Sequence, residues 1–402
     1  ERAICIVLSG TGTDGTIGVK AIKGESGMAM VQEPTSAKYA GMPSSAIATQ
    51  LVDYVSRPAA MPKQLVAYAK GPYLTGGAVA AESPSVPTEP MQKIFVLLRS
   101  RTGHDFSAYK SNTLRRRIER RMNVHQIKKP NQYVRYLQEN PHEIDILFKE
   151  LLISVTNFFR DAEAWEALAP PLEQLIKARP ENYTFRAWVP GCATGEEVFS
   201  VVISLRECME SVNCHLLDVQ VFGTDLDAAA IEMARVGQYP AGIAVDVSPQ
   251  RLERYFIRDD STYRIRKEVR KMAVFAPQNV IKDPPFTKLD MISCRNLLIY
   301  LNADLQKKLL PIFHYALKPD GLLFLGPSET IGTFTDLFEP LDKRWKIFRR
   351  KESATAIRAL PEIPAQPVAR DQGGIAAIIA PSVKETPVST QIERLLLSRF
   401  AP

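Results

Sequence analysis

Closely spaced cysteines are missing from this chain, and with them any sign of a cross-linked or zinc-bound fold. The chain has five cysteines among 402 residues, and none of them belongs to a Cys-x-x-Cys pair. Disulfide frameworks and structural zinc sites both need clustered ligands of that kind. No His/Cys cluster suggests another metal either. We therefore expect reduced thiols, a cytoplasmic location and no bound metal.

Long apolar runs are missing too. No run approaches the roughly 18 to 20 residues that a membrane-spanning helix needs, so we expect no membrane insertion. The first residues, Arg2 to Leu8, have the composition of a buried strand and lack the layout of a signal peptide. Because the chain starts at Glu1, directly in that strand and without Met, we expect it to be a fragment of a longer protein.

The chain also lacks a strong excess of one charge. Its formal net charge of +7 is mild for 402 residues, so it permits an acidic partner without requiring one. A hydrophobic content of 45% is enough to build a real core. The length favours two or three domains over one.

Shifts in composition divide the chain into segments. Residues 1–70 alternate short strands with helices and contain a Gly-rich turn at Ser9–Gly15. The predicted elements include a strand at Met28–Gln32, a turn at Ala40–Pro43, a helix at about Ser44–Leu51 and a last helix at Met61–Ala69. Residues 71–90 are rich in Gly, Pro, Ser and Thr, which is typical of a linker. The tail has no periodicity and is expected to be disordered up to one short helix at Gln391–Arg399, which we interpret as the opening of a further domain. The expected segments are 1–70, the linker 71–90, a helical domain at 91–163, a sheet domain at 164–350 and the tail at 351–402.

The sheet domain has the clearest fold signal. From Phe185 onward, buried strands alternate with helices, which predicts a doubly wound, mostly parallel, Rossmann-like α/β sheet. Residues 237–270 break that rhythm and predict a small antiparallel β insert. The predicted sheet strands are Phe185–Val189, Val219–Thr224, Met272–Ala276, Met291–Cys294 and Gly321–Leu325.

A glycine turn follows the first of these strands. The run Gly191-Cys-Ala-Thr-Gly-Glu-Glu197 predicts a tight turn and a helix start, where free backbone N–H groups can meet a ligand. The turn is not the dinucleotide Gly-x-Gly-x-x-Gly pattern, and Glu196 would repel a pyrophosphate. It suits a ligand that carries hydroxyls or an ammonium group. The alternative is an ordinary turn whose acidic residues face the helix dipole.

An acid ends the next strand. Asp225 stands about 30 residues after the glycine turn, where a carboxylate can accept hydrogen bonds from ribose hydroxyls. With no Lys or Arg in the turn to bind phosphate, this pair of features favours S-adenosylmethionine over NAD. The alternative for Asp225 is a helix N-cap.

Two further runs place polar and aromatic residues near the same edge. Cys294-Arg-Asn-Leu-Leu-Ile-Tyr300 follows a predicted central strand, and Asn296 and Tyr300 would share one face if a helix begins there. Thr156-Asn-Phe-Phe-Arg160 precedes the sheet and could cover a site. The alternatives are a buried Arg–acid pair with a core tyrosine for the first run, and core Phe with a surface Arg for the second.

A basic helix lies in the helical domain. Arg116 with Arg120, and Arg117 with Arg121, stand four residues apart, and like charges at that spacing cost helix stability. A partner for these arginines is therefore plausible, and we expect the apolar stripe of the same helix to pack on the sheet domain. A solvated face is the alternative. Nucleic acid is a weaker partner hypothesis, because interleaved aromatic residues are missing.

Together these motifs resemble a known family. Four of its signature runs occur in order, and residues 91–350 resemble the CheR family of chemotaxis receptor glutamate O-methyltransferases. The runs are Thr156–Arg160, Ala193–Glu197, Thr224–Asp227 and Cys294–Tyr300.

Residues 1–70 resemble a second family. The segments Gly12-Thr-Asp-Gly15 and Gly41-Met-Pro43 are similar to those in the C-terminal part of CheB receptor methylesterases. The whole chain therefore resembles a slice of a CheB–CheR fusion. In CheB the residue matching Asp14 orients a catalytic His, but the Ser and His of that triad would lie before Glu1. We expect this piece to have no esterase activity.

The CheR resemblance implies S-adenosylmethionine-dependent methylation of glutamate side chains in chemoreceptors, with S-adenosylhomocysteine as product. It implies that Arg160 and Tyr300 flank the transferred methyl group and the carboxylate. The implied partners are the acidic helical methylation region of a receptor, which would meet Arg116, Arg117, Arg120 and Arg121, and other domains of the same hybrid protein. An inactive cofactor-binding signalling module is the alternative, because Ser154 stands where the family often has Asn. The implied cofactor contacts are Ser154, Thr156, Arg160, Glu196, Asp225, Asn279, Val280, Arg295 and Asn296.

Overall fold

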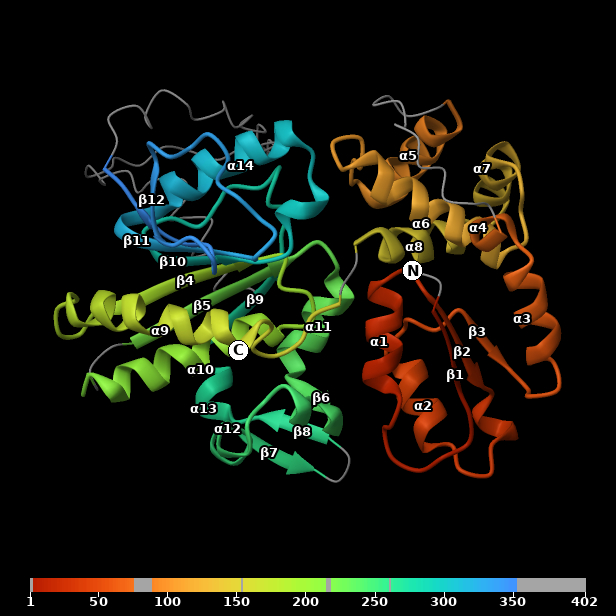
Figure 1. Cartoon of the computed structure of the whole chain (residues 1–402), viewed down its shortest axis with the longest axis horizontal. Helices are drawn as coiled ribbons and strands as arrows, with labels where there is room; N and C mark the ends of the chain where they lie inside the picture. The colour runs from red at the N-terminus through yellow and green to blue at the C-terminus, as the bar shows by residue number, and fades with distance from the viewer. Residues whose placement is uncertain (1–2, 76–88, 153–154, 215–217, 260–261, 353–402) are drawn as a thin grey trace, which may run out of the picture.

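A computed structural model shows the fold in Figure 1. No helix within its described part is long and apolar enough to cross a bilayer. The structure describes residues 3–75, 89–152, 155–214, 218–259 and 262–352. The predicted tail beyond residue 352, most of the predicted linker and Ser154 therefore lie outside the described residues.

The N-terminal piece is a small α/β unit, drawn in red in Figure 1. Its strands are parallel in the order β1-β2-β3, as the alternating apolar pattern predicts. Helix α2 begins at Gly41, so Gly41-Met-Pro43 forms its first turn and not the turn expected before Ser44; proline is well placed there because early helix positions need no N–H partner. The elements are β1 (Ile4–Val7), α1 (Thr16–Gly24), β2 (Met28–Gln32), the 3-10 turn η1 (Pro34–Ser36), α2 (Gly41–Ala48), β3 (Tyr54–Ser56) and α3 (Met61–Ala69).

Four helices form the next unit. They are α5 (Glu89–Thr102), α6 (Ser111–Val124), α7 (Pro130–Glu139) and α8 (Pro141–Leu152), preceded by the short α4 (Pro72–Thr75). Two ends of the predicted linker, around Pro72 and Glu89, are thus helical. The apolar stripe Leu114, Ile118 and Met122 of α6 packs inside this bundle. Our expectation that it packs on the sheet domain was wrong, because the neighbouring helices offer a closer apolar surface.

The C-terminal unit contains a seven-stranded sheet within the described residues, in the order β12-β13-β11-β10-β4-β5-β9. The strands from β11 to β9 are parallel, as predicted, while β13 and β12 add an antiparallel edge that the sequence reading missed. The strands are β4 (Thr184–Pro190), β5 (Asp218–Asp225), β9 (Ala273–Pro277), β10 (Leu289–Cys294), β11 (Leu317–Leu325), β12 (Phe338–Asp342) and β13 (Ile347–Arg350).

Helices cover both faces of this sheet. Residues of α9 (Ala162–Lys177) and α10 (Glu196–Ser211) pack with one face, and residues of α14 (Ala303–Ala316) pack with the other. The predicted insert is present as an antiparallel sheet in the order β6-β8-β7. The remaining elements are α11 (Ala228–Val236), β6 (Gln238–Pro240), η2 (Ala241–Val245), α12 (Pro249–Tyr255), β7 (Phe256–Asp259), β8 (Thr262–Ile265), α13 (Lys267–Arg270) and η3 (Leu298–Tyr300).

The strand order sets where a ligand can bind. The strand β4 has β5 on one side and β10 on the other, so the chain winds outward in both directions from this point. Loops that leave the carboxyl ends of β4 and β10 therefore diverge and open a crevice between them. The motifs identified in the sequence follow these strands.

Candidate active site

The glycine turn between β4 and α10 lets the start of α10 lie close to α11. Gly195 has φ 91°, and a Cβ built on it would lie 2.8 Å from the Cβ of Ala234. No other residue fits there without a shift of α11. The turn therefore holds the start of α10 against its neighbour and leaves the backbone near Gly191 and Ala193 open to the crevice.

Asp225 ends β5 beside this turn. Its carboxylate accepts hydrogen bonds from the backbone N–H of Ala193 (2.8 Å) and of Asp227 (2.9 Å). Burial raises its pKa above the usual range, while these two N–H groups oppose the rise. The N-cap of α11 is Asp227, which accepts from the N–H of Ala229, so the alternative reading of Asp225 as a cap was wrong. The carboxylate of Asp225 faces the crevice.

The loop after β10 is held by a glutamate that the sequence reading missed. Glu329 is buried, and its carboxylate accepts from the N–H groups of Asn296 (3.0 Å) and Leu298 (2.7 Å). Asn296 has a left-handed backbone, φ 62°, and only a short 3-10 turn follows it. Asn296 and Tyr300 therefore do not share the helical face considered above, although both line the same pocket.

This pocket lies at the crevice between the strand ends. It encloses about 710 Å³ of empty space, with the open solvent at its mouth included. The helical unit contributes part of the wall. The lining residues are Tyr109, Leu151, Leu152, Gly191, Ala193, Asp225, Leu226, Gln278, Asn279, Val280, Asn296, Leu297, Tyr300 and Leu301.

The polar wall of the pocket is rich in acceptors. The side-chain oxygens of Asn296 and Gln278 are buried and have no hydrogen-bond partner in the described part of the chain. The amide nitrogen of Gln278 donates to the carbonyl of Pro284 (2.8 Å), which leaves its oxygen for a ligand. With the carboxylate of Asp225, these groups suit a ligand that brings hydroxyl, amino or ammonium donors. No Lys or Arg is among the lining residues to neutralise a phosphate.

Comparisons with known proteins agree with this geometry. The chain matches the family model for the CheR methyltransferase SAM-binding domain over residues 154–347, and for the CheR all-alpha domain over 89–152. The chemotaxis protein methyltransferase of Escherichia coli is 30% identical over 64% of this chain and 87% of its own length. The chain belongs to the CheR methyltransferase family.

Its first residues match a second family. Residues 1–65 match the CheB methylesterase model, so a CheB-like piece precedes the CheR domains, as predicted. An uncharacterized 104.1 kDa protein of Rhodobacter capsulatus is 36% identical over 87% of this chain, and the chain spans 39% of that protein's length. A TehB-like SAM-dependent methyltransferase from Corynebacterium glutamicum overlaps 47% of this chain and 93% of its own, at 17% identity and a TM-score of 0.26.

The cofactor of the CheR domain is S-adenosylmethionine, and the pocket fits it. Its ribose hydroxyls and ammonium group are hydrogen-bond donors, and the unpaired oxygens of Asn296 and Gln278 together with Asp225 are acceptors. Val280 also lines the pocket. Asn279 lies at the wall, but its side chain is already engaged with Ile281 and Lys282 backbone N–H groups.

Arg160 lies on a strained loop and is not among the residues that line the pocket. Its neighbours Phe159 and Asp161 both have positive φ, 47° and 58°, which turns the chain sharply around it. Arg295 is buried behind this loop: its guanidinium donates to the carbonyl of Arg160 (2.6 Å) and pairs with Asp161 (2.8 Å). Arg295 therefore braces Arg160 and is not among the residues that line the pocket, and neither is half-buried Thr156.

The two glutamates of the glycine turn face different groups: Glu196 is buried, and Glu197 is half-buried. Glu196 accepts from the Thr194 hydroxyl (2.6 Å) and pairs with Lys20 of the CheB-like piece (3.6 Å). Glu197, which the sequence reading passed over, accepts from the Ser293 hydroxyl (2.6 Å). Burial raises the pKa of Glu197 to about 7, against the opposing charge of Arg295.

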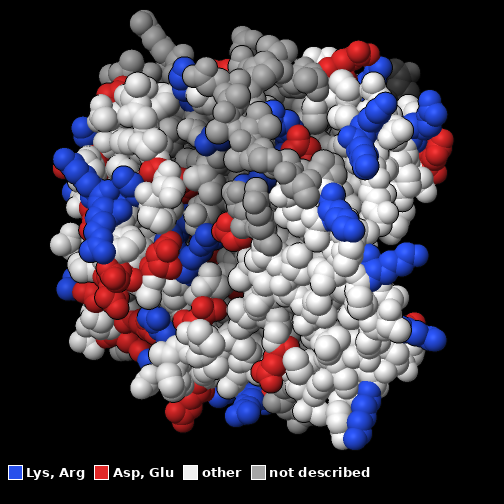
Figure 2. All heavy atoms as spheres, turned by 45° about the vertical axis from the view of Figure 1, so that its right-hand side comes forward, with Lys and Arg blue, Asp and Glu red and all other residues white. Residues whose placement is uncertain are grey.

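The arginines of α6 are not the exposed receptor surface that the sequence suggested. Arg117, Arg120 and Arg121 are buried, and Arg116 is half-buried with its guanidinium on the carbonyl of Glu25 (3.3 Å). On the right-hand half of Figure 2, Lys and Arg side chains stand singly and form no continuous basic patch. These three arginines cannot contact an external partner in this arrangement, because carboxylates of the chain occupy Arg120 and Arg121 and the backbone carbonyl of Glu150 accepts from Arg117.

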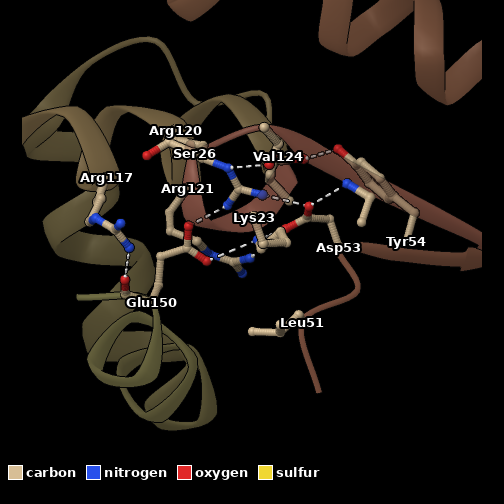
Figure 3. A network of polar contacts seen from close by, with 12 residues as sticks. Lys23, Ser26, Leu51, Asp53, Tyr54, Arg117, Arg120, Arg121, Val124 and Glu150 are labelled. Carbon is tan, nitrogen blue, oxygen red and sulfur yellow. Dashed lines mark hydrogen bonds and ion pairs between the residues drawn. The ribbon is translucent and has the colours of Figure 1, made fainter. Parts of the chain in front are cut away.

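These carboxylates come from both sides of an interface (Figure 3). Arg120 pairs with Asp53 of the CheB-like piece and with Glu150 of α8 (2.6 Å), and Lys23 of α1 bridges the same two carboxylates at 3.0 and 3.1 Å. Arg121 pairs with Glu143 (2.7 Å). The partners that we expected for these arginines thus lie within the chain itself. The network joins the CheB-like piece to the CheR helical domain.

Charge balance inside this network is close. Burial works against the ionised form of Asp53, but Arg120 and Lys23 hold its pKa below the usual range. Burial also opposes ionisation of Glu143, yet hydrogen bonds from His125 and Arg121 lower its pKa to about 2. Both carboxylates therefore remain charged at neutral pH, and each has several partners.

Asp14 stands apart from these sites. It is exposed in the loop between β1 and α1, and its carboxylate has no hydrogen-bond or ion-pair partner within the described residues. No histidine is therefore held by Asp14 in the part of the chain that the structure describes.

Proposed function

We propose that this chain transfers a methyl group from S-adenosylmethionine to glutamate side chains of chemoreceptor-type signalling proteins and so forms glutamyl methyl esters. One observation carries the proposal: an acceptor-lined pocket at the strand ends has Tyr300 in its wall. Burial raises the pKa of Tyr300, and the positive charges of Arg117 and Arg160 partly offset that rise. The charge of Arg160 thus reaches Tyr300, and we propose that the two side chains act on one substrate group.

Methyl transfer to a carboxylate requires no strong general base from the protein. When bound, the cofactor supplies an electrophilic methyl group on a sulfonium. A glutamate carboxylate is ionised at pH 7 and needs no general base. Arg160 would hold it as a charge-assisted pair, and Tyr300, which stays protonated, would donate a hydrogen bond to orient one oxygen. The protein's main contributions are alignment and exclusion of water.

The cofactor would be held from two sides. Asp225 would accept from the ribose hydroxyls, and Asn296 and Gln278 would use oxygens that have no other partner. Glu196 would accept from the ammonium group at the start of α10. The receptor's acidic helical segment would then reach the open mouth of the pocket.

Replacement of the two proposed catalytic residues tests this function. Arg160→Ala should lower turnover by about 100-fold, since misplacing a substrate group costs that order of rate. Tyr300→Phe should lower it by about tenfold through the loss of one hydrogen bond. Transfer of labelled methyl groups to a purified chemoreceptor is the measurement. The controls are Arg344→Ala and Tyr315→Phe, whose side chains are exposed. Near-wild-type rates in both test variants, with folding intact, would overturn the roles.

A second function has one observation in its favour. Lys20 of the CheB-like piece pairs with Glu196, which is only 2% exposed, and so places a cation where the cofactor's ammonium group would bind. This arrangement favours a signalling module in which cofactor binding and the position of the CheB-like piece oppose each other. Binding of S-adenosylhomocysteine by calorimetry, without methylation of any receptor, would support it; Lys20→Ala should then tighten binding, whereas Lys63→Ala, an exposed control, should not.

We also propose that the CheB-like piece of this chain is inactive as an esterase. Asp14 has no His partner among the described residues, and a triad member alone cannot activate a nucleophile. Incubation of the chain with a methylated receptor should release no methanol above background. Hydrolysis that disappears in Asp14→Ala would contradict this.

A further inference from the structure

The pocket has a wall that comes from the CheR helical domain. The segment between α5 and α6 runs antiparallel to the loop after β10, with a bridge between Tyr109 and Leu301. The N–H of Lys110 donates to the carbonyl of Tyr300 (2.9 Å), and the N–H of Asn302 donates to the carbonyl of Ala108 (3.2 Å). These backbone bonds fix Tyr109 in the pocket wall, on the same pocket as Asp225.

A histidine holds the hydroxyl of this tyrosine. His104 is 3% exposed, its Nε2 lies 3.0 Å from the Tyr109 hydroxyl, and its Nδ1 lies 3.2 Å from the side-chain nitrogen of Asn279. Burial, together with the charge of Lys282, lowers the pKa of His104 to about 4, so the ring is neutral at pH 7 and carries one N–H.

Asn279 decides which ring nitrogen carries that proton. Its side-chain oxygen accepts from the N–H groups of Ile281 (3.0 Å) and Lys282 (3.3 Å), so its nitrogen is the atom that faces His104. The Nδ1 atom of His104 must then accept from Asn279, and Nε2 must carry the proton and donate it to the oxygen of Tyr109. The Tyr109 hydroxyl proton is left over for a different acceptor.

Burial keeps that proton in place. The pKa of Tyr109 is raised well above its ordinary value by burial and by the nearby charge of Asp225. The hydroxyl is therefore a hydrogen-bond donor throughout the neutral range. It is a donor on a pocket in which Asp225, Asn296 and Gln278 offer acceptors.

We infer that Tyr109 is a cofactor-binding residue that donates a hydrogen bond to the nucleoside part of the cofactor, with His104 and Asn279 as positioning residues. This rests on the proposed use of the pocket for S-adenosylmethionine. The nucleoside is the part concerned because Tyr109 lies near Asp225, the proposed ribose ligand. Asn279 thus acts by orienting His104, and its own amide is fully engaged in the structure.

Calorimetric titration with S-adenosylhomocysteine and with adenosine tests the inference. Tyr109→Phe should weaken both ligands by about tenfold, since one hydrogen bond to the shared nucleoside is lost. The ring contact with Phe106, at 5.0 Å between centroids, is kept, so the variant should fold. Tyr136→Phe on α7 is the matched control and should bind like wild type. Unchanged affinity for adenosine in Tyr109→Phe would overturn the inference.

A double-mutant cycle tests the positioning role. His104→Ala should weaken binding in the wild-type background and add nothing in the Tyr109→Phe background, because both changes remove the same oriented donor. Additive losses would show a merely structural effect of His104 and would overturn its role. If the wild-type chain binds the nucleoside but methylates no receptor, the proposed transfer fails while the role of Tyr109 stands; if it binds neither ligand, both fail.

Discussion

The chain buries charge in two places and treats the carboxylates there in opposite ways. At the interface between the CheB-like piece and the helical domain, Asp53 accepts from Arg120, from Lys23 and from the N–H of Ala29, and its pKa is lowered. Beside the cofactor pocket, Glu197 accepts from one hydroxyl, that of Ser293, and its pKa is raised. Desolvation opposes ionisation of both carboxylates, so the number of cationic and N–H partners makes the difference.

The two places also differ in how many hydrogen-bond partners their side chains have. In the interface Arg120 and Arg121 have several partners each, whereas in the pocket the side-chain oxygens of Asn296 and Gln278 have none in the described part of the chain. Native proteins seldom leave buried acceptors unpaired. Ion pairs that are shared by several groups indicate a structural joint, and unpaired acceptors that line a pocket indicate a place kept for a ligand. Charge density alone, which drew attention to α6 in the sequence, does not separate the two.

The largest effect should come from breaking the shared ion pairs at the interface. Asp53→Asn removes the charge that balances Lys23 and Arg120, and loss of one member of a buried ion pair costs about 3–5 kcal/mol. We expect the free energy of unfolding to fall by that amount at pH 7, as measured by urea denaturation and far-UV circular dichroism. Glu33→Gln, in an exposed pair with Arg57, should cost less than about 1 kcal/mol. Equal losses in the two variants would remove the distinction.

The second largest effect should be on the pH dependence of stability. Glu197 keeps its proton up to about pH 7 in the folded chain, whereas the unfolded chain loses it near 4.5. The folded state binds more protons in between, so this group's contribution is complete below pH 4.5 and is lost as the pH rises through 7. Because one pKa unit is about 1.4 kcal/mol, the loss between pH 4.5 and about pH 7 is at most about 3.5 kcal/mol.

Glu197→Gln should flatten that part of the stability curve. Urea denaturation at several pH values between 4.5 and 7.5 is the measurement, and the slope should be less negative than in wild type. Glu339→Gln, whose side chain is half exposed, serves as the control and should keep the wild-type slope. A variant slope equal to that of wild type would mean that Glu197 is ionised throughout.

The smallest effect on the free energy of unfolding is expected for replacement of Asn296, whose side-chain oxygen has no partner in the described part of the chain. Asn296→Gly keeps the left-handed backbone and removes an oxygen that has no partner, so the free energy of unfolding should change by less than about 1 kcal/mol. The affinity for S-adenosylhomocysteine should fall by about tenfold. Calorimetry and urea denaturation on the same samples compare the two. A large loss of stability with unchanged affinity would reverse our assignment of this residue.

Much of the fold could be predicted because local patterns determine it. Helix α3 has the predicted bounds Met61–Ala69 and strand β2 the predicted bounds Met28–Gln32, since a proline near the helix start and a fully buried apolar run leave little choice. The edge strands β12 and β13 were missed. Their sequences are short and mixed, and they pair with each other and with β11 only once the sheet exists.

The residues of the site also divide into those that could be predicted from the sequence and those that could not. Asp225, Asn296 and Tyr300 could be placed in one pocket because each follows a strand end. Glu329, His104 and Tyr109 could not, since their roles depend on contacts between distant segments. The burial of Arg120 was unpredictable for the same reason: its partners Glu150 and Asp53 are 30 and 67 residues away along the chain.

Helix α1 has a consequence for how the CheR domains move. Lys20 and Lys23 stand one helical turn apart, yet Lys20 pairs with Glu196 of the sheet domain and Lys23 with Glu150 of the helical domain. The pocket lies between these two domains, with Leu151 contributed by one and the strand ends by the other. A hinge opening of the pocket would pull the two lysines in different directions. The CheB-like piece should therefore restrain movement between the two CheR domains. The rate at which a nucleoside enters or leaves the pocket should depend on these ion pairs.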